Sequence, residues 1–251
     1  MLLEKNTDLL AVSCDNYSDL WNPFFTSLFK FWPNCNLDVH LLSNHKSYEN
    51  GRVSSIVVGD DISWSDNLLK CLNNLHKEYV LIFIEDCMLN KKVDNLYFKK
   101  LISWVDEHSP NYLRLNISHK PDYYDDLVGS IPIKTAYKTS TLPCLWKRTV
   151  LQELLKPGES AWDFEIFGSV RAYKYGKFFA VYNSLFSFEN GVIKGKWRKS
   201  TLKKLKQRGV KIDTSSRDTM SSIEELLYQM RVTRSVLFNQ LPNFFRRSLK
   251  Q

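Results

Sequence analysis

An uninterrupted apolar run that ends in two acids, residues 79–90 (YVLIFIEDCMLN), most limits the folds open to this chain. The five residues Val80–Ile84 show no polar alternation, which is typical of a strand buried on both faces. Glu85 and Asp86 follow directly, so this strand delivers two carboxylates to one edge of a sheet. Ligands of open α/β sheets bind outside the carboxyl ends of strands, so we expect a divalent cation and a phosphorylated ligand at this edge.

Strand-like and helix-like segments alternate on both sides of this run. Short apolar or alternating stretches predict extended segments over residues 8–14, 37–42, 53–58, 112–117, 135–146 and 178–188. Amphipathic repeats predict helices over residues 17–32, 64–75, 93–107, 149–155 and 160–173. Alternation with short connections is typical of a mostly parallel sheet covered by helices, so the predicted fold class is α/β. A hairpin is predicted near residue 190, because Asn190-Gly191 is a turn signal.

Charge is distributed unevenly along the 251 residues. Residues 191–251 contain 15 Lys and Arg against 4 Asp and Glu, or +11. Of the chain's 35 basic and 27 acidic residues this leaves 20 against 23, or −3, for the first 190. We therefore predict a main domain over residues 1–200 and a basic helical carboxyl-terminal extension over residues 201–251. A basic segment of this kind favours contact with anionic lipid, nucleic acid or phosphorylated ligands.

Nothing in the sequence indicates export or a disulfide framework. The amino terminus has no basic region followed by an apolar run, and no apolar stretch approaches the roughly 20 residues of a membrane-spanning helix. The cysteines are odd in number and form no CxxC pair, which argues against both disulfides and a zinc site. We expect a cytoplasmic protein with five reduced cysteines: Cys14, Cys35, Cys71, Cys87 and Cys144.

A second group of acids begins the helix predicted after Pro157-Gly158. Ser160 is a capping-type residue, and Glu159, Asp163 and Glu165 surround it. The apolar face of this helix is predicted to be buried and to consist of Trp162, Ile166, Phe167 and Val170. In the structural interpretation the acids stabilise the helix start through its dipole and Trp162 belongs to the core.

The order of these parts resembles a GT-A type nucleotide-sugar glycosyltransferase. The resemblance rests on the first strand with Asp15 behind it, the WSDNLLKCLNNL helix, the YVLIFIEDCML strand and the later GESAWDFEIFGS helix, and it spans about residues 8–200. The nearest likeness is to bacterial enzymes that build capsule or lipopolysaccharide O-antigen. It implies a GT-A-like (Rossmann-like) fold and transfer of a sugar from a nucleotide-sugar donor to a growing surface polysaccharide or a lipid-linked saccharide.

The resemblance also implies a donor site at the strand ends. Family members carry a DxD motif that holds a metal ion, whereas this chain has Glu85-Asp86-Cys87. A contact with a Mg²⁺ or Mn²⁺ ion or with the donor is therefore expected from Asp86 first and Glu85 second, with the metal on Asp86 and Glu85 as a donor-binding residue. In the structural interpretation these acids only cap the strand. Further donor contacts are expected from five residues: Asp15, Asn16, Tyr17, Trp64 and Asp66.

Inverting members of this family place a carboxylate at a helix start below the acceptor. Glu165 matches that role and Asp163 is the second choice, because burial against neighbouring aromatic rings would raise the pKa of such a carboxyl toward that of a useful base. Trp162 is expected to stack on an acceptor sugar, and Glu159 to contact it.

The basic segment around Gly195 is the last donor candidate. Lys194 and Lys196 could close over a diphosphate and stabilise the leaving group. Equally, they could belong to a solvated hairpin edge.

The carboxyl-terminal segment repeats apolar residues at helical spacing, at Ile223, Leu226, Leu227, Met230 and Leu237, with arginines between and LPNFFRRSLKQ behind. It is predicted either to contact the anionic inner face of the cytoplasmic membrane, where lipid-linked acceptors reside, or to pack on the main domain or a partner.

Two other classes of protein compete with the glycosyltransferase assignment. A sugar-phosphate nucleotidyltransferase would need a Gly-rich phosphate loop near the amino terminus, and LLAVSCDNYSDL has none. A nucleic-acid-binding module would use the basic tail, and we do not expect nucleic acid as a partner.

Overall fold

The computed structural model describes residues 5–117 and 120–240, and side chains up to residue 233. The chain divides into two compact units between Glu189 and Asn190. This division precedes residue 200, where sequence analysis places it, because residues 191–198 pair within the second unit: the Arg198 amide donates to the Gly191 carbonyl at 2.9 Å. The predicted tail segment 241–251 and the side chain of Leu237 lie outside the described residues.

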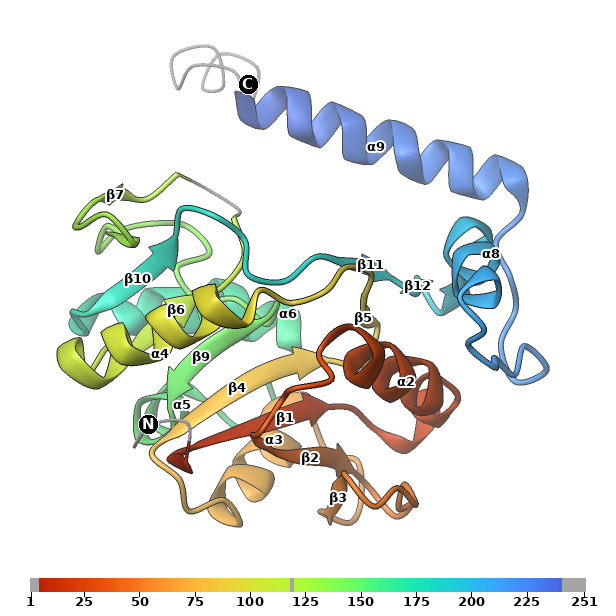
Figure 1. Ribbon diagram of the computed structural model, residues 1–251, viewed down its shortest axis with the longest axis horizontal. Helices are drawn as coiled ribbons and strands as arrows, with labels where there is room; N and C mark the ends of the chain where they lie inside the picture. Colours follow the sequence, from red (N-terminus) through yellow and green to blue (C-terminus); the bar gives the residue numbers. More distant parts are fainter. Residues whose placement is uncertain (1–4, 118–119, 241–251) are drawn as a thin grey trace. The chain divides into compact units, whose positions relative to one another are not determined.

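Within the described residues, a mixed sheet of nine strands forms the first unit, in the order β3-β2-β1-β4-β9-β6-β10-β8-β7. Strands β1 to β4 pair in parallel, β9 runs antiparallel between β4 and β6, and β10 is parallel to β6. The α/β fold is thus confirmed (Figure 1). The strand bounds are β1 Thr7–Val12, β2 Asp38–Ser43, β3 Ser54–Val57, β4 Tyr79–Ile84, β6 Tyr112–Arg114, β7 Asp122–Tyr123, β8 Val128–Ser130, β9 Cys144–Lys147 and β10 Phe178–Val181.

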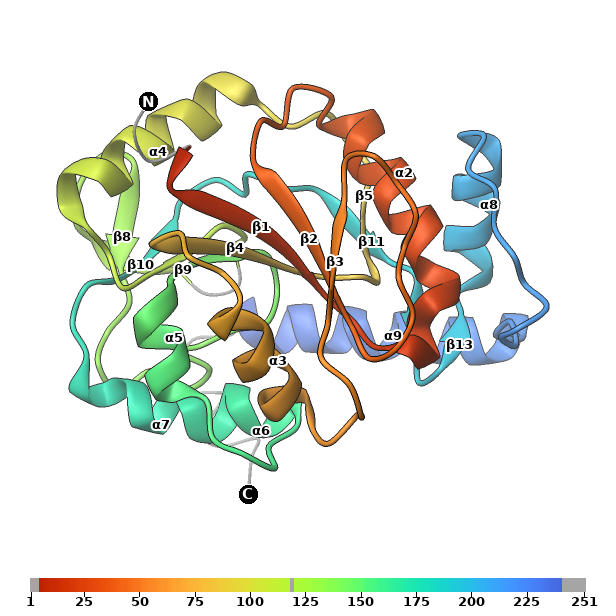
Figure 2. The same cartoon turned by 90° about the horizontal axis from the view of Figure 1, so that it is seen from below.

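Helices cover both faces of this sheet, as Figures 1 and 2 show. One face carries α2 (Trp21–Phe31), which follows a 3₁₀ turn η1 (Asp15–Leu20), and α4 (Asn95–His108). The other face carries α3 (Trp64–Asn73), α5 (Arg148–Leu154) and a continuous helical segment over residues 161–174, made of α6 (Ala161–Asp163), η2 (Phe164–Gly168), α7 (Ser169–Arg171) and η3 (Ala172–Lys174). α3, α4 and α5 lie within two residues of their predicted ranges, and α2 begins four residues after its predicted start because the 3₁₀ turn η1 precedes it.

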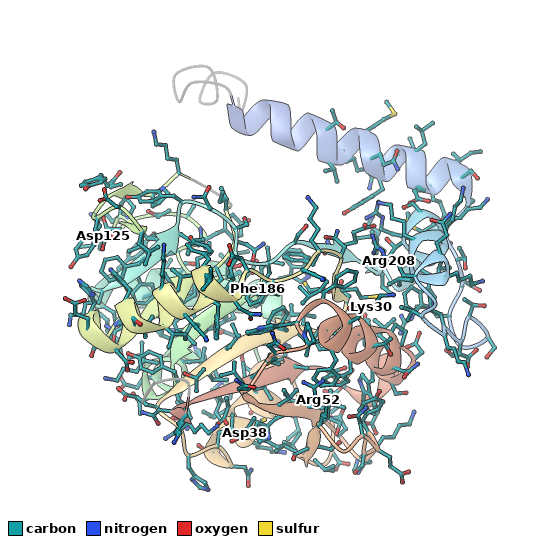
Figure 3. All side chains as sticks on the ribbon, in the orientation of Figure 1. Lys30, Asp38, Arg52, Asp125, Phe186 and Arg208 are labelled. Atoms are coloured by element: carbon teal, nitrogen blue, oxygen red, sulfur yellow. The ribbon has the colours of Figure 1, made fainter. Side chains whose placement is uncertain are left out.

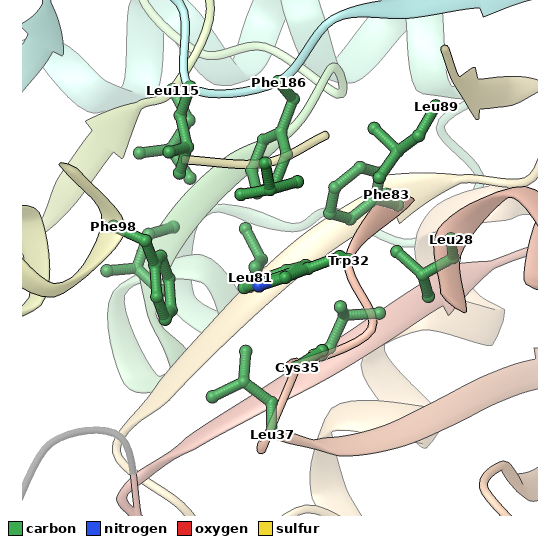
Figure 4. Close-up of a cluster of buried hydrophobic side chains, with 14 of the residues drawn as sticks. Leu28, Trp32, Cys35, Leu37, Leu81, Phe83, Leu89, Phe98, Leu115 and Phe186 are labelled. Carbon is green, nitrogen blue, oxygen red and sulfur yellow. The ribbon is translucent and has the colours of Figure 1, made fainter. Parts of the chain in front are cut away.

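Strand β4 is the centre of both hydrophobic cores. Leu81 and Phe83 belong to the core under α2 and α4, part of which Figure 4 shows, and Val80 and Ile82 belong to the core under α3 and α5. These four side chains are 2% exposed or less. The prediction of a strand buried on both faces is therefore confirmed.

Side-chain caps fix where the two helices that flank β4 begin. The Ser63 side chain accepts a hydrogen bond from the Asp66 amide at the start of α3. Asp94 accepts bonds from the Leu96 and Tyr97 amides at the start of α4, and that helix ends at Ser109 in the left-handed region, with φ of 46°. Caps of this type satisfy amides that have no partner within the helix.

Two extended segments are shorter than predicted. Of the predicted residues 135–146 only 144–146 belong to a strand, β9, and β10 ends at Val181, so residues 183–187 form an irregular connection. Behind the acids, β5 (Cys87–Leu89) pairs with β11 (Phe188–Asn190) in a separate two-stranded sheet. The five cysteines are free thiols, as predicted.

In the second unit, β12 (Val192–Ile193) and β13 (Lys196–Trp197) form a hairpin, followed by α8 (Lys199–Gln207) and α9 (Ser222–Gln240). The hairpin turn is at Lys194-Gly195, where φ is 51° and 78°, and the prediction of a turn at Asn190-Gly191 is wrong. Two consecutive positive φ angles suit a two-residue hairpin turn, whereas Asn190 stays extended in β11. No helix in the described part of the chain has the length and apolar character needed to cross a bilayer.

A buried ion pair joins the amino ends of three neighbouring strands of the first unit. The Asp8 carboxylate lies 3.3 Å from His40 Nε2 and 3.1 Å from Lys77 Nζ, and Lys77 also contacts Asp38 at 2.5 Å. Burial alone would raise the pKa of Asp8, but hydrogen bonds from His40 and Lys77 outweigh it and lower that pKa. The ionised carboxylate therefore stabilises the fold.

We predict that Asp8→Asn lowers the free energy of unfolding by about 2 kcal/mol at pH 7, because it leaves Lys77 without its buried partner. The folded-state pKa of Asp8 lies below its usual 3.8, so the carboxylate contributes fully above that pH and its contribution is lost as the pH falls further. Urea unfolding at pH 7 and below pH 4 should show that the difference in unfolding free energy between wild type and variant becomes smaller in acid.

Asp38→Asn is the matched control. This partner of Lys77, labelled in Figure 3, is 70% exposed, and its substitution should lower the free energy of unfolding by less than about 1 kcal/mol. Equal effects of the two variants would contradict the assignment.

Candidate functional site

The carboxyl ends of the parallel strands meet at one edge of the first sheet, which we call the carboxyl edge. Val12 at the end of β1 is in register with Leu42 of β2 and with Ile84 of β4, and Ser43 of β2 is in register with Val57 of β3. The segments that follow these strands, residues 13–17, 44–46, 58–61 and 85–86, therefore lie along this edge. It is the edge at which ligands of such sheets bind.

Asp15 ties the first two strand ends together. Its carboxylate accepts hydrogen bonds from the backbone amides of Asn44 at 3.0 Å, His45 at 3.0 Å and Lys46 at 3.2 Å. Asn44 in turn donates to the Gly59 carbonyl behind β3 at 3.1 Å. Burial would raise the pKa of Asp15, but these amide bonds outweigh it and lower the pKa. Asp15 thus positions the loops of the carboxyl edge, and a donor contact from it stays a prediction.

Asn16 and Tyr17 follow Asp15 in the 3₁₀ turn η1. Asn16 is exposed and Tyr17 is half-buried. They lie on the carboxyl edge, where the predicted donor would bind, and their contacts with it stay a prediction.

Acidic side chains from different strand ends surround Cys14. Burial raises the pKa of the Cys14 thiol, and the negative charges of Asp61 and Glu85 raise it further. Asp61 accepts a hydrogen bond from Asn67 at 2.6 Å, and Asp60 lies 3.1 Å from the His45 ring. The carboxyl edge is therefore anionic around β1, β3 and β4.

Glu85 and Asp86 end the central strand inside the protein. Glu85 is 5% exposed, and burial raises the pKa of Asp86 to about 6. The Asp86 carboxylate is met by the Cys87 thiol at 3.6 Å and by no cationic side chain within the described residues. A carboxyl of this kind would be ionised more readily by a cation beside it.

Protein side chains alone do not complete a metal site in the described part of the chain, because three or more His, Cys, Asp or Glu side chains nowhere gather around one point. Asp86 fits a Mg²⁺ or Mn²⁺ ion only if ligand phosphates complete the coordination. The cation stays a prediction.

The start of α3 is fastened to the loop that precedes α6. Asp66 accepts hydrogen bonds from the Ser63 hydroxyl at 2.6 Å and from the Gly158 amide at 2.7 Å. The Trp64 ring packs on Phe164, with ring centroids 5.5 Å apart. The structure therefore brings the predicted donor residues Trp64 and Asp66 next to the segment that holds the second group of acids. Asp66 has a structural role here, because it holds the start of α3 to the loop before α6.

Two of the acids in that segment have structural partners. Asp163 and Ser160 form a capping box, in which Asp163 accepts from the Ser160 hydroxyl at 2.6 Å and from its amide at 3.0 Å. These bonds lower the pKa of Asp163. Glu159 forms a bidentate pair with Arg171 at 2.7 and 2.5 Å.

The apolar face predicted for this helix is wrong. Trp162 is 75% exposed, and Ile166, Phe167 and Val170 are also exposed, whereas Phe164, Gly168, Ser169 and Ala172 are buried. The buried side of this segment is instead the one that carries Phe164, whose ring packs on Trp64 and Trp146, so the predicted face is directed to solvent. Residues Phe164–Gly168 form a single π-helical turn, η2. Single π turns of this kind often occur at functional sites.

Glu165 lies in this π turn and is anchored through one oxygen. Its Oε1 accepts hydrogen bonds from the Thr141 amide at 2.7 Å, the Thr141 hydroxyl at 2.8 Å and the Ser140 hydroxyl at 3.3 Å. Its Oε2 has no hydrogen bond to any described residue. The carboxylate is therefore held in one orientation with one oxygen available.

Ser140 and Thr141 bring Glu165 to the carboxyl edge. They precede β9, whose first residue, Cys144, is in register with Ile82 of the antiparallel β4. The chain before Cys144 thus extends over the carboxyl end of β4, where Asp86 lies. Sequence reasoning missed Ser140 and Thr141, because hydrogen bonds between segments 24 or 25 residues apart leave no periodic signal.

Lys194 and Lys196 belong to the second unit. Lys194 is exposed in the hairpin turn, and Lys196 pairs with Glu224 at 2.7 Å. Their contact with a donor stays a prediction.

No protein-family model and no curated protein matches this sequence. Solved structures do match it. S. aureus TarS 1-349 matches with a TM-score of 0.52 at 13% identity, over 74% of this chain and 60% of that chain. The same fragment in complex with UDP matches with a TM-score of 0.50 at 13% identity, over 72% and 58%. UTP-bound UGPase from Acinetobacter baumannii matches with a TM-score of 0.51 at 8% identity, over 91% and 99%.

These similarities concern the fold. This chain spans 60% of the TarS fragment that it matches. The shared architecture is the helix-covered α/β sheet described above, and in open sheets of this kind ligands bind outside the carboxyl ends of the strands.

Gly168 allows the π turn to pack, which gives a test of the architecture around Glu165. A Cβ at residue 168 would lie 2.8 Å from the Phe164 ring, which is buried between Trp64 and Trp146. We predict that Gly168→Ala lowers the free energy of unfolding by about 1–2 kcal/mol, because the clash exceeds the gain in helix propensity. Gly176→Ala is the control, since a Cβ there meets nothing within 4 Å. Thermal unfolding of both variants measures this, and an unchanged Gly168→Ala melting temperature would show that Phe164 is free to move.

Proposed function

We propose that this chain transfers a sugar from a nucleotide-sugar donor to a hydroxyl group of a saccharide acceptor. The observation that carries the proposal is the anchored carboxylate of Glu165 at the carboxyl edge, with Oε2 available to take a proton. The fold gives support, because S. aureus TarS 1-349 shares it and has been crystallised in complex with UDP.

In the proposed reaction the acceptor oxygen bonds to the anomeric carbon of the donor sugar while the bond from that carbon to the diphosphate breaks. The acceptor proton passes to Glu165 Oε2, the nucleoside diphosphate leaves, and the anomeric configuration inverts. Asp163 is the second choice for the base, because the hydrogen bonds from Ser160 lower its pKa and so make it a weaker base.

The donor would lie along the carboxyl edge, with its nucleotide beside Asn16, Tyr17 and the loops that Asp15 holds. Trp64 and Asp66 would border the sugar from the start of α3.

Asp86, supported by Glu85, would hold a Mg²⁺ or Mn²⁺ ion together with the donor phosphates. When bound, this ion would neutralise negative charge on the leaving diphosphate.

The acceptor side would include Trp162. Its 75% exposed indole offers an apolar face on which a sugar ring can stack. Glu159, paired with Arg171, would contact the acceptor less directly. We propose a growing bacterial surface polysaccharide of the capsule or O-antigen kind, or its lipid-linked precursor, as the acceptor.

The experiment compares nucleotide binding with turnover. Thermal shift against a panel of nucleotides and nucleotide-sugars, with and without Mn²⁺, should show stabilisation, about 2.7 kcal/mol for a ligand at 100 times its Kd. Glu165→Gln keeps the shape of the side chain but cannot take the proton, so it should lower transfer or donor hydrolysis at least about 100-fold while donor stabilisation persists. Glu107→Gln, an exposed carboxylate on α4, is the control. Absence of stabilisation by every nucleotide refutes the proposal, and full turnover in Glu165→Gln moves the base elsewhere.

A sugar-phosphate nucleotidyltransferase is the second candidate, favoured by the match that covers 91% of this chain and 99% of the UGPase. Against it, the short connection between β1 and the 3₁₀ turn η1 contains no glycine, whereas this class of enzyme needs a Gly-rich phosphate loop there. The two candidates differ in product: release of pyrophosphate from UTP and a sugar phosphate would favour the nucleotidyltransferase.

The second unit supports a membrane-associated role for the same enzyme. On α9, Ile223 is 72% exposed and Leu226, Leu227 and Met230 are also exposed, at helical spacing. On α8, Leu202 and Leu205 are buried and the lysines Lys199, Lys203, Lys204 and Lys206 are exposed. Exposed apolar side chains combined with basic ones suit the interface of an anionic bilayer, and we propose that this unit contacts the inner face of the cytoplasmic membrane.

We predict that the full chain co-sediments with vesicles of phosphatidylglycerol and phosphatidylcholine but not with phosphatidylcholine alone. Ile223→Ser combined with Met230→Ser should reduce binding several-fold, because each loss removes apolar area from the bilayer. Gln229→Ser on the same helix is the control. Unchanged vesicle binding in the double variant, or a dimer that the double variant dissociates, would contradict membrane contact.

A further inference from the structure

The first unit contains a cavity that is lined by none of the site residues assigned above. This cavity of about 930 Å³ lies between the start of α4, the end of β6 and residues 183–188. Its volume falls within the range of small-molecule sites, about 300–1,000 Å³. We call it the lysine cavity, because Lys91, Lys92 and Lys100 line it.

The walls of the lysine cavity are fixed to the core. Asn116 donates through Nδ2 to the Phe186 carbonyl at 2.7 Å, and the Leu185 amide donates to the Leu115 carbonyl at 2.9 Å. The Phe186 ring is 1% exposed and packs on Phe83, with ring centroids 4.9 Å apart (Figures 3 and 4). The cavity is therefore preformed, which lowers the entropic cost of filling it.

The charge in the cavity is positive and unbalanced. Lys91, Lys92 and Lys100 form no hydrogen bond or ion pair with any described residue. Asp94 is the acidic side chain of the lining, and its carboxylate accepts the Leu96 and Tyr97 amides at the start of α4. Three like charges around one hollow repel each other and attract an anion.

This positive charge contrasts with the rest of the first unit. The first 190 residues carry 20 basic against 23 acidic side chains, a net charge of −3. A cluster of three unpaired lysines is thus a local property of the cavity.

Neutral polar groups complete the lining. The Asn116 Oδ1 atom is buried and has no hydrogen-bond partner among the described residues, and the Asn183 and Ser184 side chains are exposed. Tyr97 and Phe188 add aromatic surface. Amides, hydroxyls and aromatic rings beside cations are the groups that bind a sugar carrying acidic substituents.

The lysine cavity is close in the chain to the proposed reaction site. Lys91 follows Asp86 by five residues, so their Cα atoms are at most about 18 Å apart. Strand β6, which ends beside Asn116, is parallel to β4 because both pair antiparallel with β9. Its carboxyl end therefore belongs to the same edge of the sheet.

We propose that the lysine cavity binds an anionic saccharide, one whose units carry carboxylate or phosphate groups, and that this saccharide is the acceptor. The acceptor role rests on the proposed function. The binding itself rests on the cavity.

The experiment measures binding of three probes by calorimetry at low salt: an oligogalacturonate, an oligo(glycerol phosphate) and neutral maltohexaose. Wild type should bind at least one charged probe and bind the neutral one more weakly, and the charged probe that binds identifies carboxylate or phosphate. The combined variant Lys91→Gln, Lys92→Gln and Lys100→Gln should weaken that binding about tenfold or more, because charge-assisted hydrogen bonds are lost. Lys99→Gln, the exposed neighbour outside the cavity, should bind like wild type.

Nucleotide binding of the same proteins separates this inference from the proposed function. The triple variant should keep the stabilisation by nucleotide that wild type shows. Loss of both nucleotide and charged-saccharide binding would assign the cavity to the donor diphosphate and overturn the inference. Equal binding of charged and neutral probes, or an equal effect of Lys99→Gln, would also overturn it. Charged-saccharide binding that requires the three lysines, in a chain that binds no nucleotide, would support the cavity and refute the glycosyltransferase.

Discussion

The parallel pairing of β1 with its two neighbours is the constraint on which the rest of the structure depends. With Val12 in register with both Leu42 and Ile84, the strand ends cannot separate, so every segment that follows them must share one edge. Burial of β4 on both faces fixes this register, since a shift by one residue would turn each apolar side chain toward the opposite core. The carboxylates at this edge are the consequence of that packing, and Asp86 is held there although its burial disfavours the charge.

Sequence periodicity could predict the elements because each of them faces a core. The α/β class, the central strand and the long helices follow from apolar spacing, which records burial directly. The wrong predictions concern places where an interaction other than the spacing of apolar residues determines the structure. Trp162 and Ile166 share one helical face, but that face is exposed because Phe164 on the other side packs against Trp64 and Trp146. Lys194-Gly195 forms the hairpin turn because the pairing of β12 with β13 places it there.

The candidate site was predictable only in part, for a related reason. Acids that follow a buried strand are visible in the sequence, so Asp86 and the segment of Glu165 could be found. The oxygen of Glu165 that Ser140 and Thr141 hold is the product of tertiary contact, and so are the hydrogen bonds that occupy Asp15, Asp66 and Asp163. The lysine cavity left no sequence signal either, because Lys91 and Lys100 meet Asn116 and Asn183 only after folding.

The carboxyl edge is acidic at one end and basic at the other, and this difference bears on the proposed reaction. Around β1, β3 and β4 the edge is acidic, which suits a donor diphosphate only in the presence of a cation or of basic groups from elsewhere in the chain. Beyond β5 and at the end of β6, the lysine cavity is basic and suits an anion without such help. An anionic acceptor would thus be attracted to the lysine cavity without a cation, whereas the donor diphosphate, which is also anionic, would need a bound cation to occupy the acidic end, so the cation would separate the two substrates. Glu165 lies in the helical segment that covers the face of the sheet opposite to α4, and its available oxygen lies at the carboxyl edge. A general base needs this position to act on an acceptor hydroxyl that points toward the donor sugar.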